Sequence, residues 1–390
     1  MQLRFFVAFL MVVAGVFLCS CHPEYHAEPK LQVSIDPRAS DARRFSELFE
    51  EARYVPLRGG VPLGPPGRIR YRGDTILLSA GQPASCLHLY EANGTFLRSI
   101  CNSGDGPGAY STIRDFAWES DRSAPLTILD RNRMTNYTYS SDGTFHGGYR
   151  HSLFANALHP LGDRFLAMYC GNELTENTRK LIIWDRQEHA IAREFLEVDP
   201  RQRKYLNFFD RNNFLEFQDS LFFVQAFDNT VYHLTEKKIQ PRLVLDFDDL
   251  TLPPAFLDRP YQDVMEFMET LRRTDYAFRV IGYYESAAFI AFCFEHAGRF
   301  KLALYDKDSR RHRVTHRLTD DLVYNGLSLE PIVEYGPLAV TPNGFFVFWM
   351  EELTTTGTVP EPERRPAGAE PDMRSSIDGV LLLAKPKRIR

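Results

Sequence analysis

Short stretches in which apolar and polar residues alternate recur along most of the chain, and many of them end in an aromatic residue before a polar turn. One example has Leu87, Leu89 and Tyr90 before the turn at Asn93 and Gly94. Alternation with a period of two is typical of a half-buried β-strand. Asn-Gly between two such strands is among the strongest hairpin signals. The pattern therefore predicts a β-hairpin at this place.

The same strand-turn-strand unit occurs five times, with turn centres near residues 93, 142, 187, 236 and 308. Two more strands fit before each hairpin, for example 69–71 and 75–79 before the first one. A period of roughly 40 to 50 residues that holds four short strands is typical of β-propeller blades. The spacing therefore predicts five blades.

A sixth blade is predicted from the two ends of the chain together. Strands at 345–349 and 380–384 lie near the C-terminus, and the early strand 52–57 completes their sheet. Such closure leaves no long open sheet edge. The predicted fold class is thus all-β, a six-bladed β-propeller over residues 45–390, with its last blade closed by N- and C-terminal strands.

Two segments interrupt the strand pattern. Within 255–273, apolar residues recur at helical spacing, which predicts one inserted amphipathic helix lying on the propeller surface; they are Leu257, Tyr261, Val264, Met268 and Leu271. Residues 351–376 are rich in Thr, Pro, Glu and Arg. That composition is typical of a mobile loop.

The first residues read as a targeting segment. An apolar run covers 5–18 and ends in Leu18-Cys19-Ser20-Cys21, which resembles the bacterial lipobox. The run has the length of a signal-peptide core and is short for a membrane span. We therefore predict a lipoprotein signal peptide over 1–20, lipidation of Cys21 and a flexible tether over 21–44. An ordinary secretory signal cleaved nearby fits the same apolar run.

Charge and composition narrow the functional classes. The chain has 46 Lys and Arg against 51 Asp and Glu, a net charge of −5. A nucleic-acid-binding domain is usually strongly basic, so we expect no nucleic-acid partner. Hydrophobic residues make up 44% and charged residues 25%, which is typical of a globular protein rather than a multi-span membrane protein.

Two cysteines flank the Asn93-Gly94 turn. A two-residue loop would place Cys86 and Cys101 directly opposite each other, where they could form a disulfide. A three-residue loop with a glycine bulge would shift the register by one. Both loops fit the sequence. Cys170 and Cys293 lie in apolar strands and are predicted to be small buried residues.

A glycine-rich segment lies between the first two predicted blades. It contains Gly104, Gly106, Pro107, Gly108 and Tyr110. Glycine can adopt positive φ and proline fixes its own φ, so these residues predict a tight structural crossing between blades. No GK[ST] sequence follows, which argues against a phosphate-binding loop.

This segment resembles the Gly-x-Gly-Pro-Gly-Glu-Tyr signature of the six-bladed β-propeller lipoproteins of Gram-negative, gut-type bacteria, relatives of the NHL-repeat propellers. The segments 54–57, 228–232 and 252–254 are also similar to that family, so the resemblance covers about residues 45–390. Ala109 stands where the family has Glu, and no binding role is carried over for it. The resemblance implies a cell-envelope protein, on either side of the outer membrane, that serves as an accessory to an outer-membrane uptake system.

Catalytic motifs are few. His312 and His316 have the spacing of a zinc-binding HExxH helix, but Arg313 replaces the Glu and the segment reads as a strand, so no metal site is predicted. Propellers build sites in the central funnel from residues distant in sequence. The polar residues that we expect near the inner strands are Asp115, Asn156, His159, Glu216 and Glu285.

The sequence thus predicts a lipid-anchored, non-catalytic binding or scaffold module. Its expected partners are the membrane, through the N-terminal lipid, and either an envelope protein or a glycan or peptide ligand. No catalytic residue and no cofactor are predicted. The alternative is a metal-dependent hydrolase or lyase with its site in the funnel, for which calcium is the ion to consider.

Overall fold

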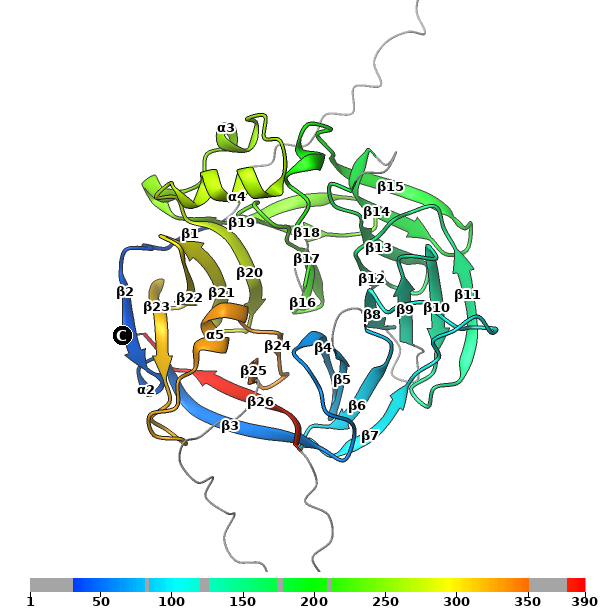
Figure 1. Cartoon of the computed structure of the whole chain (residues 1–390), viewed down its shortest axis with the longest axis horizontal. Coiled ribbons are helices and arrows are strands. Elements are labelled where there is room, and N and C mark those ends of the chain that lie inside the picture. Colours follow the sequence, from blue (N-terminus) through cyan, green and yellow to red (C-terminus); the bar gives the residue numbers. More distant parts are fainter. Residues whose placement is uncertain are drawn as a thin grey trace, which may run out of the picture.

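The computed structural model describes residues 31–80, 84–119, 126–173, 178–208, 212–350 and 377–389. Within them the strands form six sheets, which stand around a central axis like the blades of a propeller (Figure 1). The predicted all-β, six-bladed fold is therefore confirmed. The predicted signal peptide, Cys21 and the loop 351–376 lie outside the described residues.

Blades one to three each contain four consecutive antiparallel strands, with the first strand innermost. Blade one is built of β4 (Pro66–Arg72), β5 (Thr75–Ala80), β6 (Leu87–Glu91) and β7 (Phe96–Ile100). Blade two is built of β8 (Asp115–Trp118), β9 (Leu126–Asp130), β10 (Thr135–Tyr139) and β11 (Phe145–Arg150). Blade three is built of β12 (Ala157–Leu161), β13 (Phe165–Tyr169), β14 (Arg179–Asp185) and β15 (Ala190–Glu197).

Blades four and five follow the same plan and gain a fifth strand from the N-terminal segment. Blade four is built of β16 (Phe214–Phe217), β17 (Ser220–Phe223), β18 (Thr230–Leu234), β19 (Ile239–Asp246) and β1 (Leu31–Ser34). Blade five is built of β20 (Phe278–Glu285), β21 (Phe289–His296), β22 (Arg299–Asp306), β23 (Arg311–Thr319) and β2 (Ser40–Arg44). The five predicted hairpins are the connections between the third and fourth strands of blades one to five.

The sixth blade joins the two ends of the chain. It is built of β24 (Ala339–Val340), β25 (Phe346–Met350), β26 (Ile377–Pro386) and β3 (Phe49–Arg58). β26 pairs antiparallel with β3, with Leu381 opposite Val55 and Leu383 opposite Arg53. The predicted closure by N- and C-terminal strands is confirmed. The N-terminal strand β3 and the C-terminal strands β24, β25 and β26 must therefore pair before the ring is closed.

Burial follows the position of a strand within its blade. All eight residues of β21 are buried, because both of its faces pack against neighbouring blades. The outer strand β7 exposes Leu97 and Arg98 at its centre, because it lies at the outer edge of its blade. A continuous buried run therefore marks a middle strand, and exposed positions within a strand mark the outer edge of a blade.

The predicted tether over 21–44 is wrong for its described part, residues 31–44. β1 pairs parallel with β19 and β2 pairs parallel with β23, so this N-terminal strap lies along the outer edges of blades four and five. Val33 and Ile35 are fully buried there. The short α2 (Phe45–Leu48) then leads into β3. The strap covers two sheet edges that would otherwise be open to pairing.

The single helix predicted over 255–273 is also wrong in its extent. The structure has a short α3 (Pro254–Leu257) and a longer α4 (Val264–Arg272), joined by a non-helical segment that contains Pro260. Proline disfavours the helical conformation in the residue before it, which accounts for the break. Asp263 caps α4 by accepting a hydrogen bond from the Glu266 amide.

The insertion lies on the outside of the ring, as predicted (Figure 1). Its buried residues form one cluster with Tyr205, Leu206, Phe227 and Phe278 from the adjoining loops and strand. Two 3-10 turns, Gln202–Lys204 and Asp248–Leu250, adjoin this region. One more helix, α5 (Glu330–Tyr335), lies nearer the centre of the ring and precedes β24.

Candidate functional site

The inner strands begin around one end of the central channel. Arg68 on β4 contacts Asp115, the first residue of β8, with Nε 2.6 Å from Oδ1. The side chain of Arg68 is 6% exposed and that of Asp115 is 0% exposed. Arg68 Nη2 also donates to the carbonyl of Asn156, just before β12. The first three blades are therefore joined at the channel by one buried arginine.

Asp115 serves the fold rather than an open site. Its Oδ2 accepts a hydrogen bond from the Leu158 amide in blade three at 2.8 Å, and its Oδ1 accepts one from the Phe116 amide. The second funnel candidate, Asn156, donates through Nδ2 to the Cys170 carbonyl at 3.0 Å and to Glu173 at 3.2 Å. Both candidates thus lie at the channel and hold neighbouring blades together.

The other funnel candidates have partners of their own. His159 Nε2 is 3.5 Å from Glu216 Oε1, and burial lowers the pKa of His159 although the Glu216 charge opposes that shift. Glu285 ends β20 and pairs with Arg242 and Lys307. Burial alone would raise the pKa of Glu285, but hydrogen bonds and charges from these two cations outweigh it and lower the pKa. The five candidates do not converge on one point.

Sequence reasoning missed the residues that line a pocket of about 300 Å³ at the end of the channel where the inner strands begin. We call it the arginine pocket. Its lining comes from β4, from the residue Asn212 shortly before β16, from β20, from β22, and from the end of α5 with the segment that leads to β24. Its principal side chains are Arg68, Arg70, Asn212, Arg279, Tyr284, Phe300, Glu334 and Tyr335. Three arginines thus face one carboxylate among the described lining residues.

Arg70 has a neutral hydrogen-bond partner. Its Nη1 donates to Asn212 Oδ1 at 3.2 Å, which joins blade one to blade four across the channel. Its Nη2 is 3.9 Å from Asp115 Oδ1, and this buried nitrogen makes no hydrogen bond of ordinary geometry. The alternation Arg68-Ile69-Arg70 within a predicted inner strand was the available sequence signal, because polar residues on an inner strand point to the channel.

The strand on the other side of the pocket, β20, is irregular. Its pairing with β21 shifts register twice, between Phe278 and Ile281 and again between Ile281 and Tyr284. Arg279 has φ +57°, in the left-handed region that non-glycine residues rarely adopt, and Gly282 has φ +59°. A Cβ on Gly282 would lie 2.9 Å from the Pro337 carbonyl oxygen. No sequence pattern indicated these bulges.

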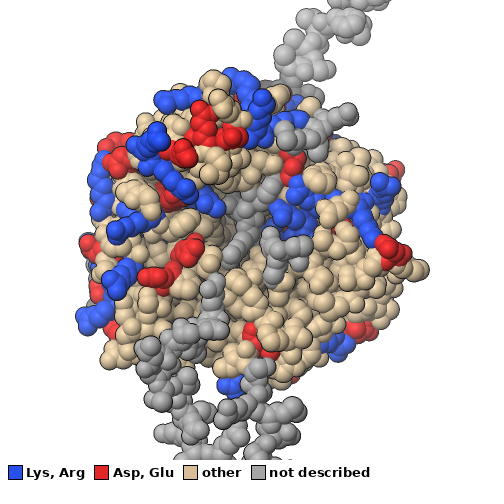
Figure 2. Space-filling model, viewed as in Figure 1, with Lys and Arg blue, Asp and Glu red and all other residues tan. Residues whose placement is uncertain are grey.

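Positive charge extends behind the pocket. Burial, with the charges of Arg131 and Arg68, lowers the pKa of Arg114 to about 10. Arg131 is paired with Glu173 and lies over the Phe154 ring at 3.9 Å. On the face seen in Figure 2, Lys and Arg side chains border the centre of the ring. This part of the channel therefore favours anions.

A second pocket, of about 570 Å³, lies where the inner strands end. Glu216, Phe217, Glu285, Phe289 and Lys385 contribute to its lining. Lys307 Nζ lies 4.3 Å from the centroid of the Phe217 ring and also bonds Glu285. The charged side chains here form ion pairs with other residues of the protein, so this pocket is a weaker candidate for a ligand-binding site.

Metal-binding geometry is not found among the described residues, where no three His, Cys, Asp or Glu side chains gather closely enough to hold an ion. His312 and His316 lie on β23 and serve the N-terminal strap. His312 Nε2 accepts a hydrogen bond from the Asp36 amide at 3.2 Å, and His316 Nδ1 is 3.1 Å from Ser40 Oγ.

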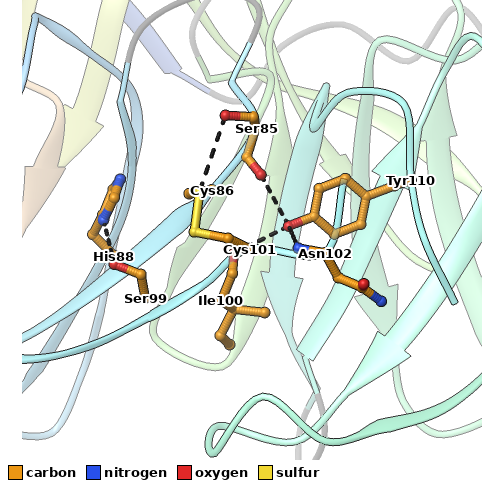
Figure 3. The surroundings of a disulfide bond; sticks show 8 residues. All are labelled: Ser85, Cys86, His88, Ser99, Ile100, Cys101, Asn102 and Tyr110. Atoms are coloured by element: carbon orange, nitrogen blue, oxygen red, sulfur yellow. Dashed lines mark hydrogen bonds between the residues drawn. A yellow bond between two sulfur atoms is a disulfide. The ribbon is translucent and has the colours of Figure 1, made fainter. Parts of the chain in front are cut away.

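The glycine-rich segment connects β7 to β8 through contacts with the protein itself. Tyr110 is fully buried, and its hydroxyl accepts from the Asn102 amide and lies 3.0 Å from the Ile100 carbonyl, as Figure 3 shows. Gly108 has φ +74°, and a Cβ there would lie 2.6 Å from the Phe145 ring. Gly104 also has positive φ, whereas neighbouring Gly106 does not. These contacts agree with a crossing between blades.

The two cysteines beside this segment form a disulfide in the structure (Figure 3). Cys86 and Cys101 have Cα atoms 4.5 Å apart. Cys170 and Cys293 are both buried as free cysteines. Burial raises the pKa of the Cys293 thiol, which makes it a poor nucleophile.

The fold and the pocket define a six-bladed β-propeller with an arginine-rich site at one end of its channel. The chain belongs to the DUF4934 family, a domain of unknown function whose sequence profile matches residues 32–364. No protein with a curated description matches this sequence. The predicted resemblance is thus confirmed for the propeller, while its lipoprotein and NHL-like aspects stay predictions.

Two solved structures have similar folds. One is a protein described as exported, from Bacteroides fragilis, with 15% identity over 92% of this chain and 100% of that chain and a TM-score of 0.69. The other is a member of the DUF4221 family from Bacteroides vulgatus, with 9% identity over 87% of this chain and 97% of that chain and a TM-score of 0.51. At these identities the likeness shows the fold alone. In the part of the chain that the structure describes, no helix is long and apolar enough to cross a membrane.

Proposed function

We propose that this protein is a non-catalytic binding module of the bacterial cell envelope, held on a membrane by a lipid on Cys21. The arginine pocket is the observation that carries the proposal. Its described lining offers guanidinium, amide and aromatic groups, which recognise a ligand by charge, hydrogen bonding and stacking. A rigid ring holds these groups in place, which lowers the entropic cost of binding.

The envelope address rests on the sequence of the first residues. Leu18 to Cys21 matches the lipobox pattern, and the apolar run before it has signal-peptide length. The similar Bacteroides fragilis protein is described as exported, which agrees with this address. The strap then begins at residue 31, so about ten residues would separate the lipid from the ring.

We further propose that the module serves an outer-membrane uptake system as an accessory. The ring offers a broad face beside the pocket, so one protein could hold a ligand and contact a transporter at once. The metal-dependent hydrolase or lyase is not favoured, because the channel end is basic and the described residues there provide no ligand set for an ion.

Two measurements on native cells test this function. Wild-type protein should fractionate with membranes, and Cys21→Ser should be released, because the acyl chains would supply the membrane affinity. Tagged wild-type protein from gently solubilised membranes should co-purify with an outer-membrane transporter in stoichiometric amount, as identified by mass spectrometry. Membrane retention of Cys21→Ser would contradict the anchor, and recovery of the protein alone would contradict the accessory role.

A further inference from the structure

We propose that the arginine pocket binds a small organic anion, a carboxylate-bearing compound of about monosaccharide size, through Arg70 and Arg279. The proposal deepens the binding role stated above and rests on it. Four features of the pocket support it.

The first feature is the charge of Arg70. Its neighbour Arg68 is matched by Asp115 at 2.6 Å, whereas Arg70 itself is 3.9 Å from that same carboxylate. The hydrogen bond of Arg70 goes to the neutral Asn212, and Nη2 is left without one. A buried donor that lacks a partner costs free energy. The Arg70 side chain as a whole is 17% exposed and lines the pocket, so part of it is open to an incoming carboxylate.

The second feature is the environment of Arg279. Its guanidinium lies 5.8 Å from the Phe208 ring centroid and 5.7 Å from that of Phe300, so aromatic faces hold it. Its nearest carboxylate oxygen is Glu295 Oε2 at 4.0 Å. The other oxygen of Glu295 already accepts from Arg272 Nε at 3.1 Å. Arg279 is therefore only weakly matched by charges of the protein.

The third feature is the backbone that carries Arg279. Two register shifts bend β20 at the pocket, and Arg279 has φ +57°. Bulges often re-aim a side chain beside a binding site. A strained non-glycine residue persists where the surroundings hold it, and such residues cluster at ligand sites. Strain and incomplete charge matching thus occur at the same residue.

The fourth feature is the size and chemistry of the space. A volume of about 300 Å³ is at the lower end of the range for small-molecule sites. Guanidinium groups bind carboxylates through two parallel hydrogen bonds. Phe300 and Tyr335 can cover a ring or an apolar group. Exposed Glu334 would repel a second negative charge, which favours a ligand with one anionic group.

The structure offers a matched pair of variants. Arg279 and Arg310 both have φ +57°, but Arg310 lies in the exposed hairpin between β22 and β23, outside the pocket. Glycine accepts this φ without strain. Arg279→Gly and Arg310→Gly therefore remove the same charge from the same backbone conformation, and only the first changes the pocket. Arg70→Gln tests the opposite wall.

The experiment is a calorimetric titration of detergent-solubilised mature protein with matched probes. D-glucuronate is compared with neutral D-glucose, and N-acetyl-L-alanine with its neutral amide, which separates acidic sugars from peptide carboxylates. We expect at least one carboxylate to bind with a Kd of about 1 mM or tighter, and its neutral counterpart about tenfold more weakly. Arg279→Gly and Arg70→Gln should each weaken binding about tenfold, and Arg310→Gly should bind like the wild type.

Three results would overturn the proposal. They are failure of both carboxylates to bind with a Kd below about 10 mM, equal binding of the neutral probes, and wild-type affinity in Arg279→Gly. Equal binding of the neutral probes would show that the pocket does not select an anion, and wild-type affinity in Arg279→Gly would place binding elsewhere. Both results leave the general binding role standing. Failure of that role would instead appear in the membrane fractionation and co-purification measurements, which do not depend on these probes.

Discussion

Cys86 and Cys101 lie opposite each other across β6 and β7 although the loop between these strands has three residues, not two. Glu91 pairs with Thr95, and Gly94 closes the turn with φ +90°. This geometry alone would shift the register by one. A β-bulge between the pairs Tyr90–Phe96 and Leu89–Arg98 shifts it back, so Leu87 faces Ile100 and the next pair is the disulfide.

The disulfide leads to the first prediction. It closes a loop of 15 residues, which by chain entropy is worth about 3 kcal/mol. The double variant Cys86→Ser/Cys101→Ser should lose roughly that free energy of unfolding, measured by urea denaturation. In denatured, unreduced protein with Cys19→Ser and Cys21→Ser, thiol titration should find only Cys170 and Cys293 reactive. Two additional thiols would show that the bond does not form in the cell.

The second prediction concerns the sixth blade. A Cβ on Gly379 would overlap Trp349 Cη2, and Trp349 is 1% exposed. Gly379→Ala should therefore lower the free energy of unfolding by about 1 to 3 kcal/mol through overpacking. Gly64→Ala is the control, because nothing lies within 4 Å of its added Cβ. Similar urea midpoints for the two variants would show that β25 and β26 do not pack this closely.

The third prediction concerns acid stability. Burial lowers the pKa of His151 to about 4, although a hydrogen bond with the Leu153 amide partly opposes the shift. Unfolded histidine titrates near 6.5, so between about pH 6.5 and 4 only the unfolded state gains this proton. The contribution of neutral His151 to the free energy of unfolding is therefore fully present above about pH 6.5, and it is lost as the pH falls toward 4.

His151→Asn keeps an acceptor but cannot gain the proton, so its unfolding free energy should depend less on pH in this window. The slope should be smaller by up to about 1.4 kcal/mol per pH unit. His146, exposed on β11, supplies the control His146→Asn. Urea denaturation at several pH values makes the measurement. Parallel pH profiles for the wild type and His151→Asn would show that His151 is not buried as described.

The fourth prediction concerns the backbone at the pocket. A non-glycine residue with left-handed φ costs roughly 1 to 2 kcal/mol, and glycine removes that cost at some expense in chain entropy. Arg279→Gly should therefore raise the free energy of unfolding by up to about 1 kcal/mol. A residue kept at the expense of stability is typical of a functional site. A clear loss of stability would show that Arg279 supports the fold.

The fifth prediction concerns the N-terminal strap. Val33 is fully buried on β1, and Lys301 Nζ donates to the Pro37 carbonyl at 2.8 Å. Val33→Asp places a charge at a fully buried position within an apolar cluster, so β1 should leave the edge of blade four. Limited proteolysis should then cut within residues 31–44, while the wild-type strap resists. Equal protection would show that the strap is held by β2 alone.

Much of the fold could be predicted because propeller blades repeat. Local signals such as Asn93-Gly94 specify a hairpin, and their spacing specifies the ring. The strap could not be predicted in this way, because β1 and β2 are short, polar in part and stabilised by pairing with β19 and β23. Pro260 was visible within the predicted helix, and its effect on the helix should have been expected.

The site was less predictable than the fold. The funnel candidates were chosen as carboxylates, amides and histidines, and Asp115 and Asn156 do lie at the channel, where they join blades. The arginine pocket depends on Arg279, whose direction is set by two bulges that no local pattern encodes. The charged residues Arg68 and Arg70 on an inner strand were the sequence feature that indicated the pocket.

The central claim is that the arginine pocket is a binding site. The most direct test is a high-resolution crystal structure of the mature protein grown with an excess of the carboxylate that binds in the titration. We predict a bound anion that contacts Arg70 and Arg279. A pocket that holds only water, with both arginines turned onto carboxylates of the protein, would show that it is not a binding site for an anion.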